Sequence, residues 1–239
     1  MHPEKQNLKQ IQALLLALVV LAFPFCAWLV YQQNQPRLEM ANMLACVYGF
    51  GLYAVFFSPW LPIPGRKLVS PSQRLQESVI IWFWVTYITH LTWEFGWLVF
   101  HDAIVNGKDA SWTYIWWAYI DGGDYRYAEF GSTLVGMEIL SVINGIVGML
   151  GLFFWYKKPC KQNLAILLFM ATAVVHLYAT SLYYLTEILE GFPNVNTESI
   201  FDIGVKFIIA NSPWLVMPCL VLKWGGKTLT EEPSGSLAQ

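Results

Sequence analysis

The chain has 239 residues, of which 56% are hydrophobic, 16% aromatic and only 13% charged, with a formal net charge of −2. A soluble domain usually carries about 25% charged residues, so this composition excludes an ordinary soluble protein and predicts a polytopic membrane protein of one domain. The near-neutral charge gives no signal for a nucleic-acid partner. The four cysteines are scattered without the spacing of a zinc site or a disulfide framework.

Six apolar stretches are long enough, or nearly so, to cross about 30 Å of hydrocarbon, which predicts an all-α membrane helix bundle. They cover residues 11–31, 41–60, 79–101, 131–156, 164–188 and 203–223. Lys and Arg gather at the N-terminus, in the second and fourth connections and at the C-terminus. Because basic residues favour the cytoplasmic side, this pattern predicts that both termini are cytoplasmic.

The first stretch has two interpretations. Lys5 and Lys9 precede an apolar run, as in a signal peptide, with cleavage after Ala27. The run continues to Tyr31, which is long for a signal peptide and favours a retained transmembrane helix.

The third connection, 102–130, is expected to form an interfacial helix and a turn at Gly122 and Gly123 that close one end of the bundle. The polar tail at 226–239 is expected to be disordered.

Ionisable residues lie inside the apolar stretches: His90, Glu94, Glu138, His176 and Glu187. A charge at bilayer depth costs roughly 2.5–3.5 kcal/mol on insertion scales, so such residues usually face a cavity or a partner. Several of them in one small protein predict a polar site inside the bundle.

His90 and Glu94 are the strongest candidates for chemistry. They are i, i+4 neighbours on a helix face that Trp93 and Trp97 share, so their side chains can hydrogen-bond. A carboxyl beside an imidazole suits general acid–base catalysis. The alternative is that the pair only ties helices together.

Polar residues in the later apolar stretches can likewise be interpreted as functional or as structural. Glu138 and Ser141 share a helix face, which fits either a second carboxylate in the cavity or a helix-packing hydrogen bond. His176 and Tyr183 belong to a polar stripe on the fifth stretch, although a histidine on an apolar helix more often only makes a structural hydrogen bond. Trp214 can present its ring to a cation or simply be buried.

No metal or nucleotide motif is present in the sequence. We therefore predict no metal ligands and no cofactor.

Five segments occur in order: HLTWEFGW, GDYRY, MEILS, LYYLTEILEGF and NSPWLVMP. Together they resemble the emopamil-binding protein family, the sterol Δ8–Δ7 isomerases of the EXPERA superfamily, over roughly residues 41–225. The resemblance implies a five-helix membrane core around a cavity open to the bilayer. Residues 1–40 would add a tail and one extra N-terminal transmembrane helix, and 226–239 would be the tail.

The resemblance also implies a reaction and roles for residues. A proton is added at carbon 9 of the sterol, a carbocation forms, and a proton leaves carbon 7, without a metal or redox cofactor. The implied catalytic residues are His90, Glu94 and Glu138. The expected substrate-binding residues are Trp93, Trp97, Ser141, Tyr183, Asn211 and Trp214, and the expected site-bracing residues are Asp124, Arg126, Tyr127 and Glu187.

This chain departs from the family pattern at Ser141, where the family has Thr, at His176, where a polar amide is expected, and at Thr180, where an Asp is expected. These changes concern the substrate more than the fold.

The expected partners are a sterol or other hydrophobic isoprenoid, the lipid bilayer and cationic amphiphilic amines acting as inhibitors, and a homodimer is left open. For a eukaryotic host the resemblance implies the endoplasmic reticulum membrane. A non-catalytic lipid-binding protein and a membrane terpene cyclase are the alternative functions.

Overall fold

The computed structural model describes residues 3–62, 69–121 and 123–231, with side chains from residue 7 onward. Its long elements are all helices, as predicted. They are α1 (Pro3–Gln32), α2 (Arg37–Phe57), α3 (Pro71–Thr89), α4 (Phe95–Asn106), α5 (Tyr114–Ile120), α6 (Arg126–Glu129), α7 (Ser132–Lys157), α8 (Gln162–Leu189) and α9 (Pro213–Thr230). Two π-helical segments join them, η2 (His90–Glu94) before α4 and η5 (Asp202–Ile209) before α9.

Within the described ranges, five helical segments are long and apolar enough to cross a membrane, which confirms the polytopic membrane architecture. They are Asn7–Gln32, Arg37–Trp60, Ser132–Lys157, Pro159–Leu189 and Asp202–Thr230. The expected third span, 79–101, is not among them. Its tryptophans, His90 and Glu94 lower its mean hydropathy, and the chain there is divided into α3, η2 and α4.

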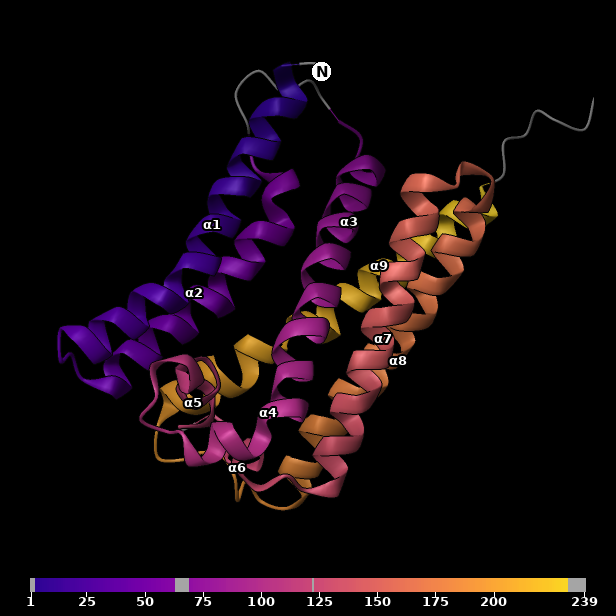
Figure 1. Ribbon diagram of the computed structural model, residues 1–239. Helices are drawn as coiled ribbons and strands as arrows, with labels where there is room; N and C mark the ends of the chain where they lie inside the picture. The colour runs from indigo at the N-terminus through magenta and orange to yellow at the C-terminus, as the bar shows by residue number, and fades with distance from the viewer. Residues whose placement is uncertain (1–2, 63–68, 122, 232–239) are drawn as a thin grey trace, which may run out of the picture.

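The bundle has two outer helical hairpins with α3 and α4 between them (Figure 1). The pair α1 and α2 lies on one side, the pair α7 and α8 on the other, and α9 crosses behind (Figure 1). The starts of α1, α3 and α8 and the ends of α7 and α9 all lie at one end. Arg74 in the first turn of α3, Lys157 at the end of α7 and Lys227 in the last turn of α9 therefore lie at that end. That this end faces the cytoplasm stays a prediction.

Two glycines let α7 approach the run of α3 and η2 very closely. A Cβ atom at Gly145 would lie 3.0 Å from Cβ of His90, and one at Gly148 would lie 2.2 Å from the Tyr87 ring. Gly136, on the same helix, would meet nothing within 4 Å. Gly145 and Gly148 thus set the distance between α7 and the segment that carries His90.

The connection 107–130 covers the opposite end of the bundle, as expected. The helix in this connection is α5, and its Trp117 donates to the carbonyl of Ile104 at 2.8 Å. That this helix lies at the membrane interface stays a prediction. The fully buried Lys206 of η5 donates to the carbonyl of Asp121 at 2.8 Å and pairs with Asp202 at 2.8 Å. These bonds fix the cover to the start of the last span. The expected turn residue Gly122 lies outside the described residues.

At the C-terminus, α9 continues to Thr230, so residues 226–230 of the expected disordered tail are helical. The hydroxyls of Thr228 and Thr230 donate to backbone carbonyls one turn earlier, at 2.8 and 2.9 Å. Residues 232–239 lie outside the described residues.

Candidate active site

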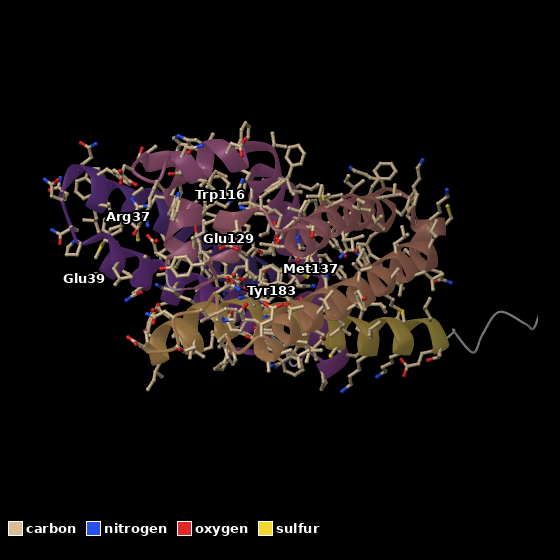
Figure 2. All side chains as sticks on the ribbon, turned by 90° about the horizontal axis from the view of Figure 1, so that it is seen from below. Arg37, Glu39, Trp116, Glu129, Met137 and Tyr183 are labelled. Atoms are coloured by element: carbon tan, nitrogen blue, oxygen red, sulfur yellow. The ribbon has the colours of Figure 1, made fainter. Side chains whose placement is uncertain are left out.

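A cavity of about 720 Å³ lies between α1, α2, the run of α3 and η2, α5, α7, α8 and the start of α9. This volume is typical of a site for a small molecule. Most of the predicted site residues line it: His90, Trp93, Glu94, Tyr127, Glu138, Ser141, Tyr183, Asn211 and Trp214. Seen from below the bundle, the lining residues Met137 and Tyr183 lie near its centre, whereas Arg37 and Glu39 lie at the edge (Figure 2).

Glu94, His90 and His176 form a continuous hydrogen-bonded row beside the cavity. Nδ1 of His90 lies 2.9 Å from Oε1 of Glu94, and Nε2 of His90 lies 2.8 Å from Nε2 of His176. All three side chains are buried. Oε2 of Glu94 and Nδ1 of His176 have no hydrogen-bond partner within the described part of the chain. The row therefore ends on a free carboxyl oxygen of a cavity-lining residue.

Trp214 joins this row through Thr86. Its indole Nε1 donates to Oγ1 of Thr86 at 3.0 Å, and that hydroxyl lies 3.3 Å from Nε2 of His90. The ring of Trp214 lies beside His90 and Trp82, with centroid distances of 6.5 and 5.4 Å. An indole in this place can present its face to a cation near His90.

Glu138 of α7 faces the same cavity and accepts a short hydrogen bond from the Tyr127 hydroxyl. Burial, and next the negative charge of Glu138, raise the pKa of Tyr127 well above its ordinary value. Tyr127 therefore stays a neutral donor to this carboxyl group. Its ring packs edge-on against Trp93 and Trp97, each at 5.2 Å, which holds the phenol in place.

A second chain of hydrogen bonds leads from the cavity to the end cover. The Asn211 amide donates to the Tyr119 hydroxyl at 2.9 Å, Tyr119 and Tyr183 share a hydrogen bond of 2.6 Å, and Tyr183 donates to Oδ2 of Asp124 at 2.5 Å. Burial, with Asp124 as the next cause, raises the pKa of Tyr119 above its ordinary value. The tyrosines are thus neutral donors whose chain ends on a carboxylate.

Arg126 braces this carboxylate. Its guanidinium holds Asp124 through two parallel bonds, Nε to Oδ1 at 2.9 Å and Nη2 to Oδ2 at 2.7 Å. It also lies 3.5 Å from Glu187, which accepts from the backbone and side chain of Asn194. Burial lowers the pKa of Arg126, but the hydrogen bonds to Asp124, together with the charges of Tyr183, Asp124 and Glu187, outweigh burial and raise the pKa overall. The clamp ties α6, α8 and the 191–201 connection together behind the cavity.

Trp97, predicted to contact the substrate, does not line the cavity. It is fully buried and donates to the carbonyl of Tyr127 at 2.8 Å. The reason is the π-helical turn at η2, which turns each residue through a smaller angle than an α-helix. Compared with a continuous α-helix, residues after Glu94 are rotated about the helix axis by about 100°, the angle that one α-helical residue covers. The prediction assumed a continuous α-helix. Trp97 therefore supports Tyr127 from behind.

The structure adds residues that the sequence did not single out for the site. Tyr119 of α5 and Leu16, Val19, Val20 and Phe23 of α1 line the cavity. His176 was interpreted as a structural histidine, and the structure places it against His90. The sequence feature that could have pointed to His176 is the polar stripe on α8, to which it belongs. No feature of the sequence indicates that α1 lines the cavity.

Comparison with known proteins agrees with this architecture. Residues 124–224 match the family model of EXPERA, the expanded EBP superfamily. The chain is 30% identical to the 3β-hydroxysteroid Δ8,Δ7-isomerase of Rattus norvegicus, over 73% of this chain and 74% of that protein. It is 29% identical to a protoglabretal synthase of Ailanthus altissima, over 81% of this chain and 85% of that protein. A probable 3β-hydroxysteroid Δ8,Δ7-isomerase of Arabidopsis thaliana is 28% identical, over 77% and 78%. The chain is thus a multi-pass membrane protein that belongs to the EBP family of the EXPERA superfamily.

Proposed function

We propose that this protein moves a carbon–carbon double bond in a sterol or related polycyclic isoprenoid, from Δ8 to Δ7 in the sterol case. The observation that carries the proposal is the placement of two carboxyl groups, Glu94 and Glu138, on the wall of one largely apolar cavity between membrane helices. Relatives named as sterol Δ8,Δ7-isomerases and as plant terpenoid synthases support the substrate class.

The reaction requires a proton donor, a stabilised cation and a proton acceptor. Glu94 delivers a proton to one alkene carbon, so that its O–H bond breaks as a C–H bond forms. The resulting carbocation then loses a proton from a neighbouring position, and a carboxylate of the site takes that proton. The energy of the cation depends on the groups that face it in a site shielded from water.

The cavity offers such groups. The Glu138 carboxyl can supply negative charge, and Trp93 and Trp214 can offer ring faces. A cation over an aromatic face gains about 2 kcal/mol when it is desolvated. The same surroundings would bind a cationic amphiphilic amine, whose ammonium group resembles the cation.

The apolar part of the wall fits a lipid-soluble substrate. Leu16, Val19, Val20 and Phe23 of α1 and Leu52 of α2 line it. Val20, Trp84 and Ile88 are exposed residues of this wall, so the cavity reaches the lipid-facing surface between α1 and α3. A substrate can enter from the bilayer through this side.

The test is turnover by the purified protein in detergent or in vesicles, with zymosterol, a plant triterpene alcohol and a linear polyene offered separately. Conversion of zymosterol to its Δ7 isomer, lost in Glu94→Gln with unchanged thermal unfolding, is the expected result. Conversion of the linear polyene alone would instead establish a cyclase, and tight sterol binding without turnover would establish a lipid-binding protein.

A further inference from the structure

His176 is a buried imidazole outside the wall of the cavity, and no step of the proposed reaction requires it. It lies on α8, with its Nε2 atom 2.8 Å from Nε2 of His90. Its ring also packs against Trp82 and Tyr87, at centroid distances of 5.8 and 6.5 Å. The ring is therefore fixed in place, and among the described residues its one hydrogen-bonding contact is His90.

Two imidazole nitrogens at this distance must share one proton, so one ring donates and the other accepts. If His90 donated, neutral His176 would carry its proton on Nδ1, which has no acceptor among the residues that the structure describes. A buried N–H without an acceptor is rare in proteins. If His176 donates, Nδ1 of His176 is only an unused acceptor, which is the less costly arrangement.

The Thr86 hydroxyl supports the same assignment. Its oxygen accepts from Trp214, so its own proton is free to point toward Nε2 of His90, 3.3 Å away. Two donors, Thr86 and His176, then converge on one nitrogen. That nitrogen is best left without a proton, which places the proton of neutral His90 on Nδ1.

A proton on Nδ1 of His90 has a consequence for Glu94. The N–H donates to Oε1 of Glu94 at 2.9 Å, so this oxygen is occupied as an acceptor. In the acid form of Glu94 the proton then belongs on Oε2, the oxygen without a partner in the described structure, and the substrate alkene is the acceptor of that proton. After that proton leaves, the same N–H stabilises the carboxylate that remains.

We propose that His176 is a positioning residue that donates to Nε2 of His90, fixes the tautomer of His90, and so directs the transferable proton of Glu94 to Oε2. The inference rests on the proposed proton-transfer function, and it assigns the proton-bearing oxygen within that function. His176 itself does not touch the substrate.

The first test compares His176→Leu, which removes the donor, with His176→Gln, whose amide N–H can replace it. We expect kcat on zymosterol to fall about 10–100-fold in His176→Leu, as when other orienting partners are removed, with KM little changed. His176→Gln should recover most of this loss. Equal kcat values in wild type and His176→Leu, or equal losses in both variants, would overturn the inference.

A double-mutant cycle separates positioning from general packing. If His176 acts only through Glu94, His176→Leu should cause little further loss in a Glu94→Asp background, where a shorter carboxyl group keeps residual activity but no longer meets Nδ1 of His90. An additional loss of the same size as in the wild-type background would contradict the proposal.

The second test does not depend on turnover. In protein labelled with ¹⁵N at histidine, the side-chain signals of His90 are assigned by their loss in His90→Gln. We expect His90 to be the Nδ1–H tautomer in wild type and in His176→Gln, and a mixture of tautomers in His176→Leu. An unchanged Nδ1–H tautomer in His176→Leu would refute the positioning role. Failure of wild type to convert either zymosterol or the plant triterpene alcohol would refute the proposed function. The tautomer of His90 would still test the positioning role of His176 on its own.

Discussion

The hydroxyl of Tyr127, on the short helix α6, donates a hydrogen bond to Oε1 of Glu138 on α7, and both side chains line the cavity. Tyr127 thus links the end cover of the bundle to a carboxyl group that faces the cavity. The bond is charge-assisted when Glu138 is ionised, and such bonds contribute about 1.5–3 kcal/mol.

Tyr127→Phe should therefore lower kcat on a Δ8 sterol about 10–100-fold, since each 1.36 kcal/mol of lost stabilisation is a factor of ten in rate. Steady-state kinetics check this. Tyr184→Phe is the matched control, because the Tyr184 hydroxyl donates to the carbonyl of Ile208 and does not line the cavity. If Tyr127→Phe is as active as this control, the Tyr127 hydroxyl does not contribute to the reaction.

Trp214 and Trp84 both line the cavity, but only Trp214 lies beside His90. We expect Trp214→Ala to weaken binding of a cationic amine about 30-fold, which corresponds to about 2 kcal/mol of cation–π energy. Binding of a neutral sterol should change much less. Trp84→Ala should affect both ligands alike. Competition binding with a labelled amine measures the difference, and equal losses in Trp214→Ala would mean that the ring only shapes the cavity.

The close contact between α7 and α3 predicts a contrast between two glycine substitutions. In Gly148→Ala the new methyl group would overlap the Tyr87 ring, whose hydroxyl is hydrogen-bonded to Thr172 at 2.6 Å. Overpacking of this kind typically costs 1–3 kcal/mol, so the unfolding temperature should fall. Gly136→Ala meets no atom within 4 Å and should be neutral or slightly stabilising. Thermal unfolding in the same detergent compares the two, and equal effects would contradict the packing described.

The helix α1 provides a wall of the cavity, so its residues should influence substrate affinity. Val20 lines the cavity and is 66% exposed, whereas Leu21 is 61% exposed and does not line it. Val20→Trp should raise KM for a Δ8 sterol several-fold with kcat nearly unchanged, because it alters binding and not the reacting groups. Leu21→Trp should leave KM as in wild type. The same KM in both variants would argue that substrate does not contact α1.

Much of the fold could be predicted because hydrophobic length and charge pattern report directly on membrane helices. The spans around Glu138 and His176 fall close to their predicted positions. The run 79–101 was harder, because a π-helical turn leaves no clear mark in composition. That turn also explains why Trp93 lines the cavity while Trp97 does not.

The site residues also divide into those that the sequence could predict and those that it could not. His90 and Glu94 could be paired from their spacing alone, because both lie on one helical run. His176 and Tyr119 could not be placed, because their contacts with His90 and Asn211 join segments far apart in the chain. The contribution of α1 to the cavity depends on how one hairpin packs against another, which spacing within a single helix does not reveal.

The most direct test of the central claim is isomerisation in deuterated water. Purified protein is equilibrated in D₂O and incubated with zymosterol, with Glu94→Gln as the control, and the products are analysed by mass spectrometry. We predict a Δ7 sterol that carries one deuterium, formed by the wild type and absent with Glu94→Gln. A Δ7 product without deuterium, or the same labelled product from Glu94→Gln, would contradict proton delivery by Glu94.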